Sequence, residues 1–386
     1  MRSSPTAATV TPIHFTNDRT GGNFGGKMAK RVVIGLSGGV DSAVAASLLK
    51  EQGYDVVGLY MSNWKDNEPD GECTGERDWA DVARVAESIG IPYYSVDFSE
   101  EYMDRVFRLF LAEYAKGRTP NPDVLCNREV KFGPFVDFAR GMGADYIATG
   151  HYAAVRHEDG RNTLLRAVDE NKDQTYFLNQ VTARQFDDVL FPLGELYKKD
   201  VREYARARAV PVAEKKDSTG ICFIGERKFR EFLAKYIPAQ EGDIVTADGK
   251  VVGRHNGVFY YTLGQRRGLG IGGSVDGTGE SWFVTGKDVA KNRLIVSQGE
   301  DGVLFRDTLV TEGFNFITPP EGDSFECLVR IRHRQPLEPA RAFVTDGGVR
   351  IEFERKQRAI TAGQYAVCYS GRVCLGGGVI GDSFDR

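Results

Sequence analysis

Near its beginning the chain has an apolar run, Val32–Leu36, followed at once by the segment Ser37–Ser42, which reads SGGVDS. Such a run is typical of a buried strand, and two adjacent glycines let backbone N–H groups approach an anion without a Cβ in the way. Two serine hydroxyls add donors, and a helix beginning here adds its positive N-terminal dipole. The pattern predicts a phosphate-binding strand-turn-helix; an ordinary strand-turn-helix corner is the alternative.

Strand and helix patterns alternate over the first half of the chain. The strand candidates are Arg31–Leu36, Asp55–Tyr60, Tyr93–Phe98 and Asp145–Ala148, and the helical stretches between them include Ser42–Gln52, Trp79–Ser88 and Glu101–Ala115. This alternation predicts an α/β domain with a parallel sheet, in which ligands bind at the carboxyl ends of the strands.

Two changes of pattern predict two further parts. From 228 to 291 the segments are short and rich in glycine, which indicates a small connecting module; from 292 to 386 short alternating strands with Asp-Gly and Ser-Gly turns predict an all-β barrel. The α/β nucleotide-binding domain is expected at 28–227. Residues 1–27 are expected to be a disordered leader, or a start upstream of the true one at Met28.

Composition narrows the class of protein. The chain has 386 residues, 41% of them hydrophobic, and lacks an apolar run of about 18 residues, so we expect a cytoplasmic protein with no membrane span. The net charge is −4, yet 198–235 holds 11 basic against 6 acidic residues and 328–358 holds 8 against 4. Both segments fit a polyanion such as RNA, or simply a solvated surface.

Five of the six cysteines fall into two groups. Without a C-x-x-C pair, neither a zinc site nor any other metal site is expected, and Cys327, Cys368 and Cys374 lie in strand-like runs that suit packing. Cys126 and Cys222 instead lie in polar segments with basic neighbours, which favour a reactive thiolate; a half-buried structural thiol is the alternative for each. Asp123, near Cys126, is a candidate general acid or base, or a Pro-Asp turn residue.

Five motifs then carry a resemblance to a known family. In chain order they read TPNPDxLCN, ATGHY, NKDQxYFL, KDSTGICFIG and LGQRxGLGIGG. With the SGGVDS loop they resemble the PP-loop ATP pyrophosphatases and, among these, the bacterial tRNA-specific 2-thiouridylase family, from about Lys30 to Gly378. The resemblance implies an enzyme that adenylates the C2 oxygen of the wobble uridine of tRNA and replaces it with sulfur, releasing AMP and pyrophosphate.

The resemblance also implies site residues. ATP, with an expected Mg²⁺ whose ligands the sequence does not reveal, would contact Gly35, Leu36, Ser37, Gly38, Gly39, Val40, Asp41, Ser42, Met61 and Gly150. The tRNA would contact Asn121, Pro122, Asp123, Lys172, Asp173, Gln174, Arg332 and His333, although His333 stands where the family usually has an aromatic phenol.

For the chemistry, the resemblance implies that Cys222 receives sulfur as a persulfide from a sulfur-carrier protein. Cys126 would help to release that sulfur and close a transient Cys126–Cys222 disulfide, with Asp123 as the third catalytic residue. Two other functions stay open: an amide-forming PP-loop synthetase, and a non-catalytic RNA-binding protein that senses ATP.

Overall fold

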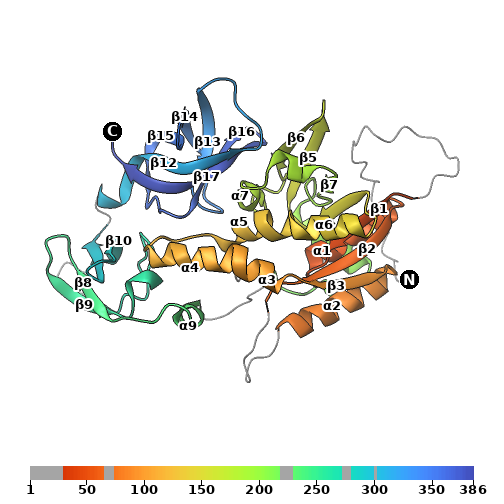
Figure 1. Cartoon of the computed structure of the whole chain (residues 1–386), viewed down its shortest axis with the longest axis horizontal. Helices are drawn as coiled ribbons and strands as arrows, with labels where there is room; N and C mark the ends of the chain where they lie inside the picture. The colour runs from red at the N-terminus through yellow and green to blue at the C-terminus, as the bar shows by residue number, and fades with distance from the viewer. Residues whose placement is uncertain (1–28, 65–73, 218–228, 272–279, 300–301) are drawn as a thin grey trace, which may run out of the picture.

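The computed structural model describes residues 29–64, 74–217, 229–271, 280–299 and 302–386. Within these ranges the chain forms an α/β part, a small four-stranded sheet and a β-barrel (Figure 1). The α/β part lies beside the barrel, and the small sheet lies beyond the far end of α4 (Arg108–Ala115). The fold class expected from the sequence is confirmed.

The α/β part is built on a parallel sheet with strand order β3-β2-β1-β4-β7. Its strands are β1 (Arg31–Gly35), β2 (Asp55–Ser62), β3 (Tyr93–Asp97), β4 (Tyr146–Thr149) and β7 (Val189–Leu190). Both faces of the central strands are covered, which explains why β1 and β2 are almost continuously apolar.

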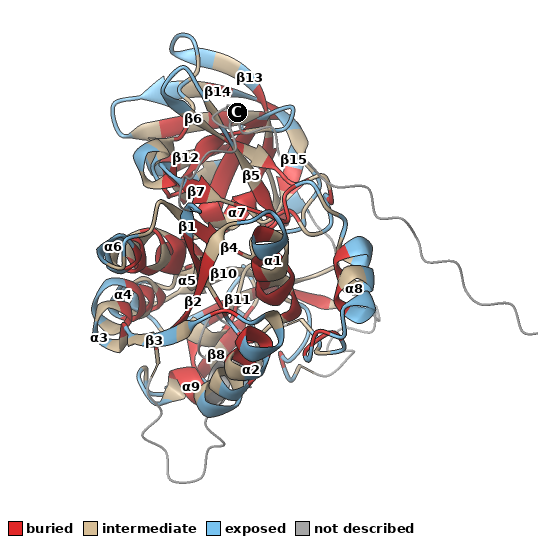
Figure 2. Cartoon of the chain, turned by 90° about the vertical axis from the view of Figure 1, so that its right-hand side faces the viewer, coloured by how far each residue is buried: buried red, intermediate tan, exposed pale blue. Residues whose placement is uncertain are grey.

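Helices cover the two faces of this sheet, and Figure 2 shows buried residues in red along the strands and the helices packed on them. One face packs against α1 (Val40–Glu51), α2 (Thr74–Ile89) and α8 (Lys198–Ala207). The other packs against α3 (Ser99–Tyr102), a π-helical turn (Met103–Phe107), α4, α5 (Pro122–Cys126), a second π-helical turn (Asn127–Lys131) and α6 (Pro134–Gly141). The helix predicted at Glu101–Ala115 is therefore present, with a π-helical turn inside it.

The small sheet has strand order β10-β11-β8-β9 and its own apolar core. Its strands are β8 (Gly242–Val245), β9 (Val251–His255), β10 (Trp282–Asp288) and β11 (Arg293–Gln298). Helix α9 (Phe229–Ala234) precedes it in the chain.

The barrel consists of six antiparallel strands, and it closes because β12 pairs with both β15 and β17. In chain order the strands are β12 (Phe305–Phe316), β13 (Ser324–Arg330), β14 (Glu338–Thr345), β15 (Gly348–Arg358), β16 (Tyr365–Ser370) and β17 (Val373–Phe384). Cys327, Cys368 and Cys374 are buried there, as the packing role predicts.

Strand pairing joins the barrel to the α/β part, in addition to the chain that connects them. The hairpin β5 (Ala153–Glu158) and β6 (Arg161–Arg166) belongs to the α/β half of the sequence, yet β6 pairs with the first residue of β17. The short helix α7 (Thr175–Leu178) follows this hairpin. The domain boundaries expected from the sequence stay a prediction. Among the described residues, no helix has the length and apolar character that crossing a bilayer requires.

Candidate functional site

The predicted phosphate loop connects the end of β1 to α1, and hydrogen bonds of its two serines hold its two ends together. The Ser42 hydroxyl donates to the Gly39 carbonyl at 3.1 Å and accepts from the Ser37 amide at 3.2 Å, and the two hydroxyl oxygens lie 3.3 Å apart. Gly39 is the N-cap of α1 and has no side chain to cap it. The first N–H groups of α1 therefore have no cap from that residue, which suits an anion at this end of the helix.

Two glycines are needed because other backbone comes very close. Gly38 has φ +71°, and a Cβ there would lie 2.7 Å from the Asp78 carbonyl oxygen. A Cβ at Gly150, just after β4, would lie 2.8 Å from the Ser42 nitrogen. Gly150 is thus packed against the first turn of α1, and the two ends of adjacent parallel strands meet at the loop.

The other predicted ATP residues lie on both sides of this turn. Gly35 ends β1, and a Cβ built there would lie 3.9 Å from the Met61 Cε atom. Leu36 and Val40 are buried apolar residues on the opposite side of the sheet from Met61. Met61 and Gly35 therefore border the loop, whereas Leu36 and Val40 anchor it in the core.

Asp41 is held by two groups that the sequence did not indicate. The Tyr152 hydroxyl donates to its Oδ1 at 2.9 Å, and the Lys198 ammonium group contacts Oδ1 at 2.7 Å and Oδ2 at 2.8 Å. Lys198 is the first residue of α8, and Tyr152 follows Gly150. The carboxylate of the loop is thus fixed at its edge, with a lysine beside it.

Lys198 also joins the loop to Asp217. Asp217 Oδ1 lies 2.7 Å from the Lys198 nitrogen and 2.8 Å from Arg202, and its Oδ2 lies 2.7 Å from Lys172. Burial raises the pKa of Asp217, but the hydrogen bonds from Lys172 and Lys198 outweigh it and hold the pKa below its usual range. Asp217 is therefore a carboxylate shared by three cations, and it is the last described residue before the segment that contains Cys222.

Lys215 approaches the loop from the other side. Its ammonium group donates to the Gly38 carbonyl at 3.1 Å and contacts Asp78 at 2.8 Å and Asp81 at 2.7 Å. Burial lowers the pKa of Lys215, but the hydrogen bonds with Asp78 and Asp81 outweigh it, so its pKa is raised and the group stays charged. Two lysines thus flank a loop that itself contains none.

The segment that carries Asn121, Pro122 and Asp123 starts α5. The Asn121 side chain accepts from the Asp123 amide at 3.1 Å and so caps the helix, with Pro122 as its first residue. Asn121, Pro122 and Asp123 are partly exposed, whereas Cys126, one turn later, is fully buried in the apolar core of the α/β part.

The approach to this segment touches all three parts of the molecule. The Gly117 carbonyl accepts from Lys287 of β10 at 2.8 Å, and the Thr119 carbonyl accepts from Gln364 of the barrel at 2.7 Å. The Thr119 amide donates to the Ala362 carbonyl at 3.0 Å. The loop before α5 is thus clamped between the small sheet and the barrel. Cys222 lies outside the described residues, so its predicted approach to Cys126 stays a prediction.

The three residues of the predicted tRNA segment Lys172–Gln174 lie in different environments. Lys172 pairs with Asp217, and Gln174 exchanges backbone and side-chain hydrogen bonds of 2.9 Å with Tyr152. Asp173 is 1% exposed and lies 3.2 Å from Arg330 of the barrel. Burial raises the pKa of Asp173 against the opposing effects of Thr175 and Arg330. Asp173 therefore links the α/β part to the barrel through its ion pair with Arg330, and its carboxylate is buried away from solvent.

Arg332 and His333 follow β13, and their side chains also lie in different environments. The Arg332 guanidinium donates to the Leu263 and Ala359 carbonyls at 3.3 and 3.0 Å and to the Thr361 hydroxyl at 2.7 Å, and burial lowers its pKa. The His333 ring lies 4.4 Å from the Phe177 ring, centroid to centroid, and burial lowers its pKa to about 4. Arg332 thus ties the barrel to the segment after β9, and His333 is a neutral ring at the boundary with α7.

The residues that sequence reasoning missed are Tyr152, Lys198, Lys215 and Asp217. The basic excess over 198–235 was the available signal for the two lysines, although it pointed to a surface rather than to the loop. Within the described ranges, no group of three or more His, Cys, Asp or Glu side chains is placed to hold a metal ion.

Comparison with known proteins gives matches along the chain. Residues 30–226 match the model described as the tRNA methyl transferase HUP domain, 230–298 the tRNA methyl transferase PRC-barrel domain, and 306–380 the aminomethyltransferase beta-barrel domain. Two solved structures are too distant to support an argument. One is an NMN synthetase from Francisella tularensis, with 19% identity, 53% of this chain and 72% of that chain covered, and a TM-score of 0.32. The other is a 4-thiouridine synthetase–RNA complex with bound ATP, with 15% identity, 54% of this chain and 50% of that chain covered, and a TM-score of 0.31.

Curated relatives are far more similar. The tRNA-specific 2-thiouridylases MnmA of Staphylococcus aureus strains bovine RF122 / ET3-1 and JH9 are each 52% identical over 362 residues, which cover 92% of this chain and 96% of the relative. A match over 92% of this chain takes in residues of all three parts. The chain therefore belongs to the tRNA-specific 2-thiouridylase family.

Proposed function

We propose that this protein is a tRNA-uridine 2-sulfurtransferase that uses ATP. The observation that carries the proposal is the 52% identity to named 2-thiouridylases over 92% of the chain, and the geometry of the Ser37–Ser42 loop supports it. The tRNA is the substrate, a sulfur-carrier protein is the donor of sulfur, and the cytoplasm, where charged and uncharged tRNA are found, is the proposed location.

The first proposed step is adenylation. The uracil C2 oxygen attacks the α-phosphorus of ATP, the bond to the β-phosphate breaks, and pyrophosphate leaves. The uncapped N–H groups of α1 and the Ser37 hydroxyl would donate to phosphate oxygens, and the Ser42 hydroxyl would do so by leaving the Gly39 carbonyl. Lys198 and Lys215 add positive charge on both sides. A Mg²⁺ bound mainly by phosphate oxygens would neutralise part of the charge, with Asp41 as the nearest carboxylate of the loop.

The second proposed step is sulfur transfer. The terminal sulfur of a Cys222 persulfide attacks C2, and AMP leaves with the former C2 oxygen. The Cys126 thiolate then attacks the Cys222 Sγ atom and breaks its bond to the transferred sulfur. A Cys126–Cys222 disulfide forms, and the transferred sulfur stays on C2 with the electron pair of the broken bond. A thiol reductant restores both cysteines. Because Cys126 is fully buried in the described structure, its reaction requires a rearrangement around α5.

The tRNA contacts are proposed with different roles. Asn121, Pro122 and Asp123 are partly exposed at the start of α5 and are suited to meet an extruded base, with Asp123 placed for proton transfer. Lys172 and His333 lie at the boundary between the two large parts. Asp173, Gln174 and Arg332 act through the positions of their neighbours, since their polar groups already bind protein atoms.

The direct test is nucleoside analysis of an unmodified tRNA transcript whose anticodon begins with uridine. After incubation with the protein, ATP and a persulfide donor, mass spectrometry should detect 2-thiouridine, and the Cys222→Ser variant should form none. A methylated nucleoside would instead favour the activity named in the domain descriptions. Unchanged 2-thiouridine in the tRNA of cells that carry Cys126→Ser or Cys222→Ser would favour the non-catalytic RNA-binding alternative. Formation of an amide product would favour the synthetase alternative.

A further inference from the structure

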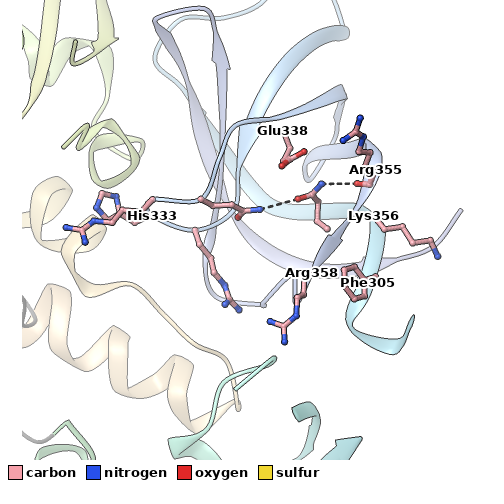
Figure 3. A pocket seen from close by; sticks show the side chains of 10 residues that line it. Phe305, His333, Glu338, Arg355, Lys356 and Arg358 are labelled. Carbon is pink, nitrogen blue, oxygen red and sulfur yellow. Dashed lines mark hydrogen bonds between the residues drawn. The ribbon is translucent and has the colours of Figure 1, made fainter. Parts of the chain in front are cut away.

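A basic cavity lies on the barrel beside the turn between β13 and β14. Its volume is about 540 Å³, which is within the range of sites that hold a nucleotide-sized group. Five cationic side chains and one carboxylate, Glu338, line it. Figure 3 shows His333 on one side of this barrel cavity, Arg355 and Lys356 on the other, and Glu338 between them.

Arg332 lines the cavity but is already engaged. Its Nη2 nitrogen donates to two carbonyls and one hydroxyl at 2.7 to 3.3 Å, so this nitrogen is fully used within the protein. Exposed cations nearby are better suited to a phosphate contact. Arg332 holds the cavity wall in place instead.

Arg334 and Arg355 are the two exposed arginines of the lining, whereas Arg358 is partly buried over the Phe283 ring. Both are exposed, and within the described ranges neither guanidinium has an ion-pair partner. Arg334 has φ +67°, a left-handed conformation that is uncommon for a residue with a side chain and that marks functional turns more often than others. Lys356 has a partner, Asp385 at 3.0 Å, but the pair is half-exposed and easily exchanged.

The position of the barrel cavity favours an RNA strand as its occupant. His333 at its rim packs on Phe177 of α7, which directly follows the Lys172–Gln174 segment. The cavity therefore adjoins the boundary between the α/β part and the barrel, close to a segment that is itself a predicted tRNA contact. Arginine guanidinium groups donate two hydrogen bonds in the geometry that a phosphodiester accepts.

We propose that Arg334 and Arg355 each bind a backbone phosphate of the tRNA, with Lys356 as an auxiliary cation. This inference rests on the proposed function, because it takes tRNA as the substrate. The contact is independent of base sequence, since a phosphate carries no sequence information. It fixes the position of the tRNA on the barrel while the base enters the α/β part.

The test is equilibrium binding of an unmodified tRNA transcript to the full chain at several salt concentrations. One lost phosphate contact lowers the slope of log K against log salt by about 0.9, which weakens binding about eightfold at ~0.1 M salt. Arg334→Gln and Arg355→Gln should each show this change. Arg341→Gln, which removes an exposed arginine elsewhere on the barrel, is the matched control and should bind normally.

A variant of opposite sign sharpens the test. Glu338→Gln removes the one carboxylate that the described residues contribute to the cavity lining, and it should strengthen tRNA binding several-fold without reducing the salt slope. If the Arg334→Gln/Arg355→Gln double variant binds tRNA with the wild-type affinity and slope, the inference is wrong. That result is distinct from failure of the proposed function, in which the wild-type protein forms no 2-thiouridine.

Discussion

Replacing Gly150 with alanine tests whether the loop geometry determines ATP binding. The new Cβ would lie 2.8 Å from the Ser42 nitrogen, 2.9 Å from the Ser42 Cα and 3.0 Å from the Asp41 carbonyl carbon. These are backbone atoms and cannot rotate away. Ordinary contact begins at 3.4 Å, so the backbone after β4 and the first turn of α1 must separate by about 0.6 Å.

Overpacking of this kind costs about 1–3 kcal/mol. If that strain falls on the loop conformation that binds phosphate, the affinity for ATP should fall by about 5- to 150-fold. The measurement is calorimetric titration with a non-hydrolysable ATP analogue, accompanied by a thermal melt to show that the variant is folded at the titration temperature.

Gly141→Ala is the matched control. Gly141 ends α6, and a Cβ there would have no atom within 4 Å, so this variant should keep the wild-type affinity. If folded Gly150→Ala binds the analogue as tightly as Gly141→Ala does, the close approach of the two backbones does not control nucleotide binding, and the reasoning is refuted.

Three further predictions concern charges around the site. Lys198→Met should weaken ATP binding about tenfold in the same titration, because the loop carboxylate loses its cation, whereas Lys199→Met on the exposed side should not; equal affinities would contradict this. Arg330→Met should lower the free energy of unfolding by about 3 kcal/mol in urea, because Asp173 stays buried with only the more distant Arg166 as its cation. A loss under about 1 kcal/mol would count against a stabilising Asp173–Arg330 ion pair. Burial lowers the folded-state pKa of His333 from 6.5 to about 4, so on acidification the unfolded state takes up a proton first and stability falls between pH 6.5 and 4. The melting temperature of His333→Phe should fall less than that of the wild type over this window. An equal fall in the two proteins would contradict the assignment.

Much of the fold could be predicted from local patterns. The strand predicted at Arg31–Leu36 is β1, and the helix expected from Ser42 begins two residues earlier, because Gly39 rather than a serine forms the N-cap. These elements follow from apolar runs and glycines that are adjacent in the sequence. The hairpin β5–β6 was not predicted to join the barrel, because its partner strand is some 200 residues away and pairing at that distance leaves no local signal.

The same distinction applies to the site. Ser37, Ser42 and the glycines form one short motif, so their meeting at one loop could be predicted. The partners of Asp41 could not, because Tyr152 and Lys198 are 111 and 157 residues away in sequence and an exposed-looking lysine is common in any helix. Arg332 shows the reverse case: a cation in a basic run that the fold uses internally.

The central claim is that the uridine C2 oxygen is adenylated at this loop and leaves with AMP. A tRNA transcript labelled with oxygen-18 at that position tests it most directly, when it is incubated with the protein, ATP and a persulfide donor and the AMP is examined by mass spectrometry. The account predicts labelled AMP in an amount equal to the 2-thiouridine formed. Unlabelled AMP, or ADP as the nucleotide product, would contradict it.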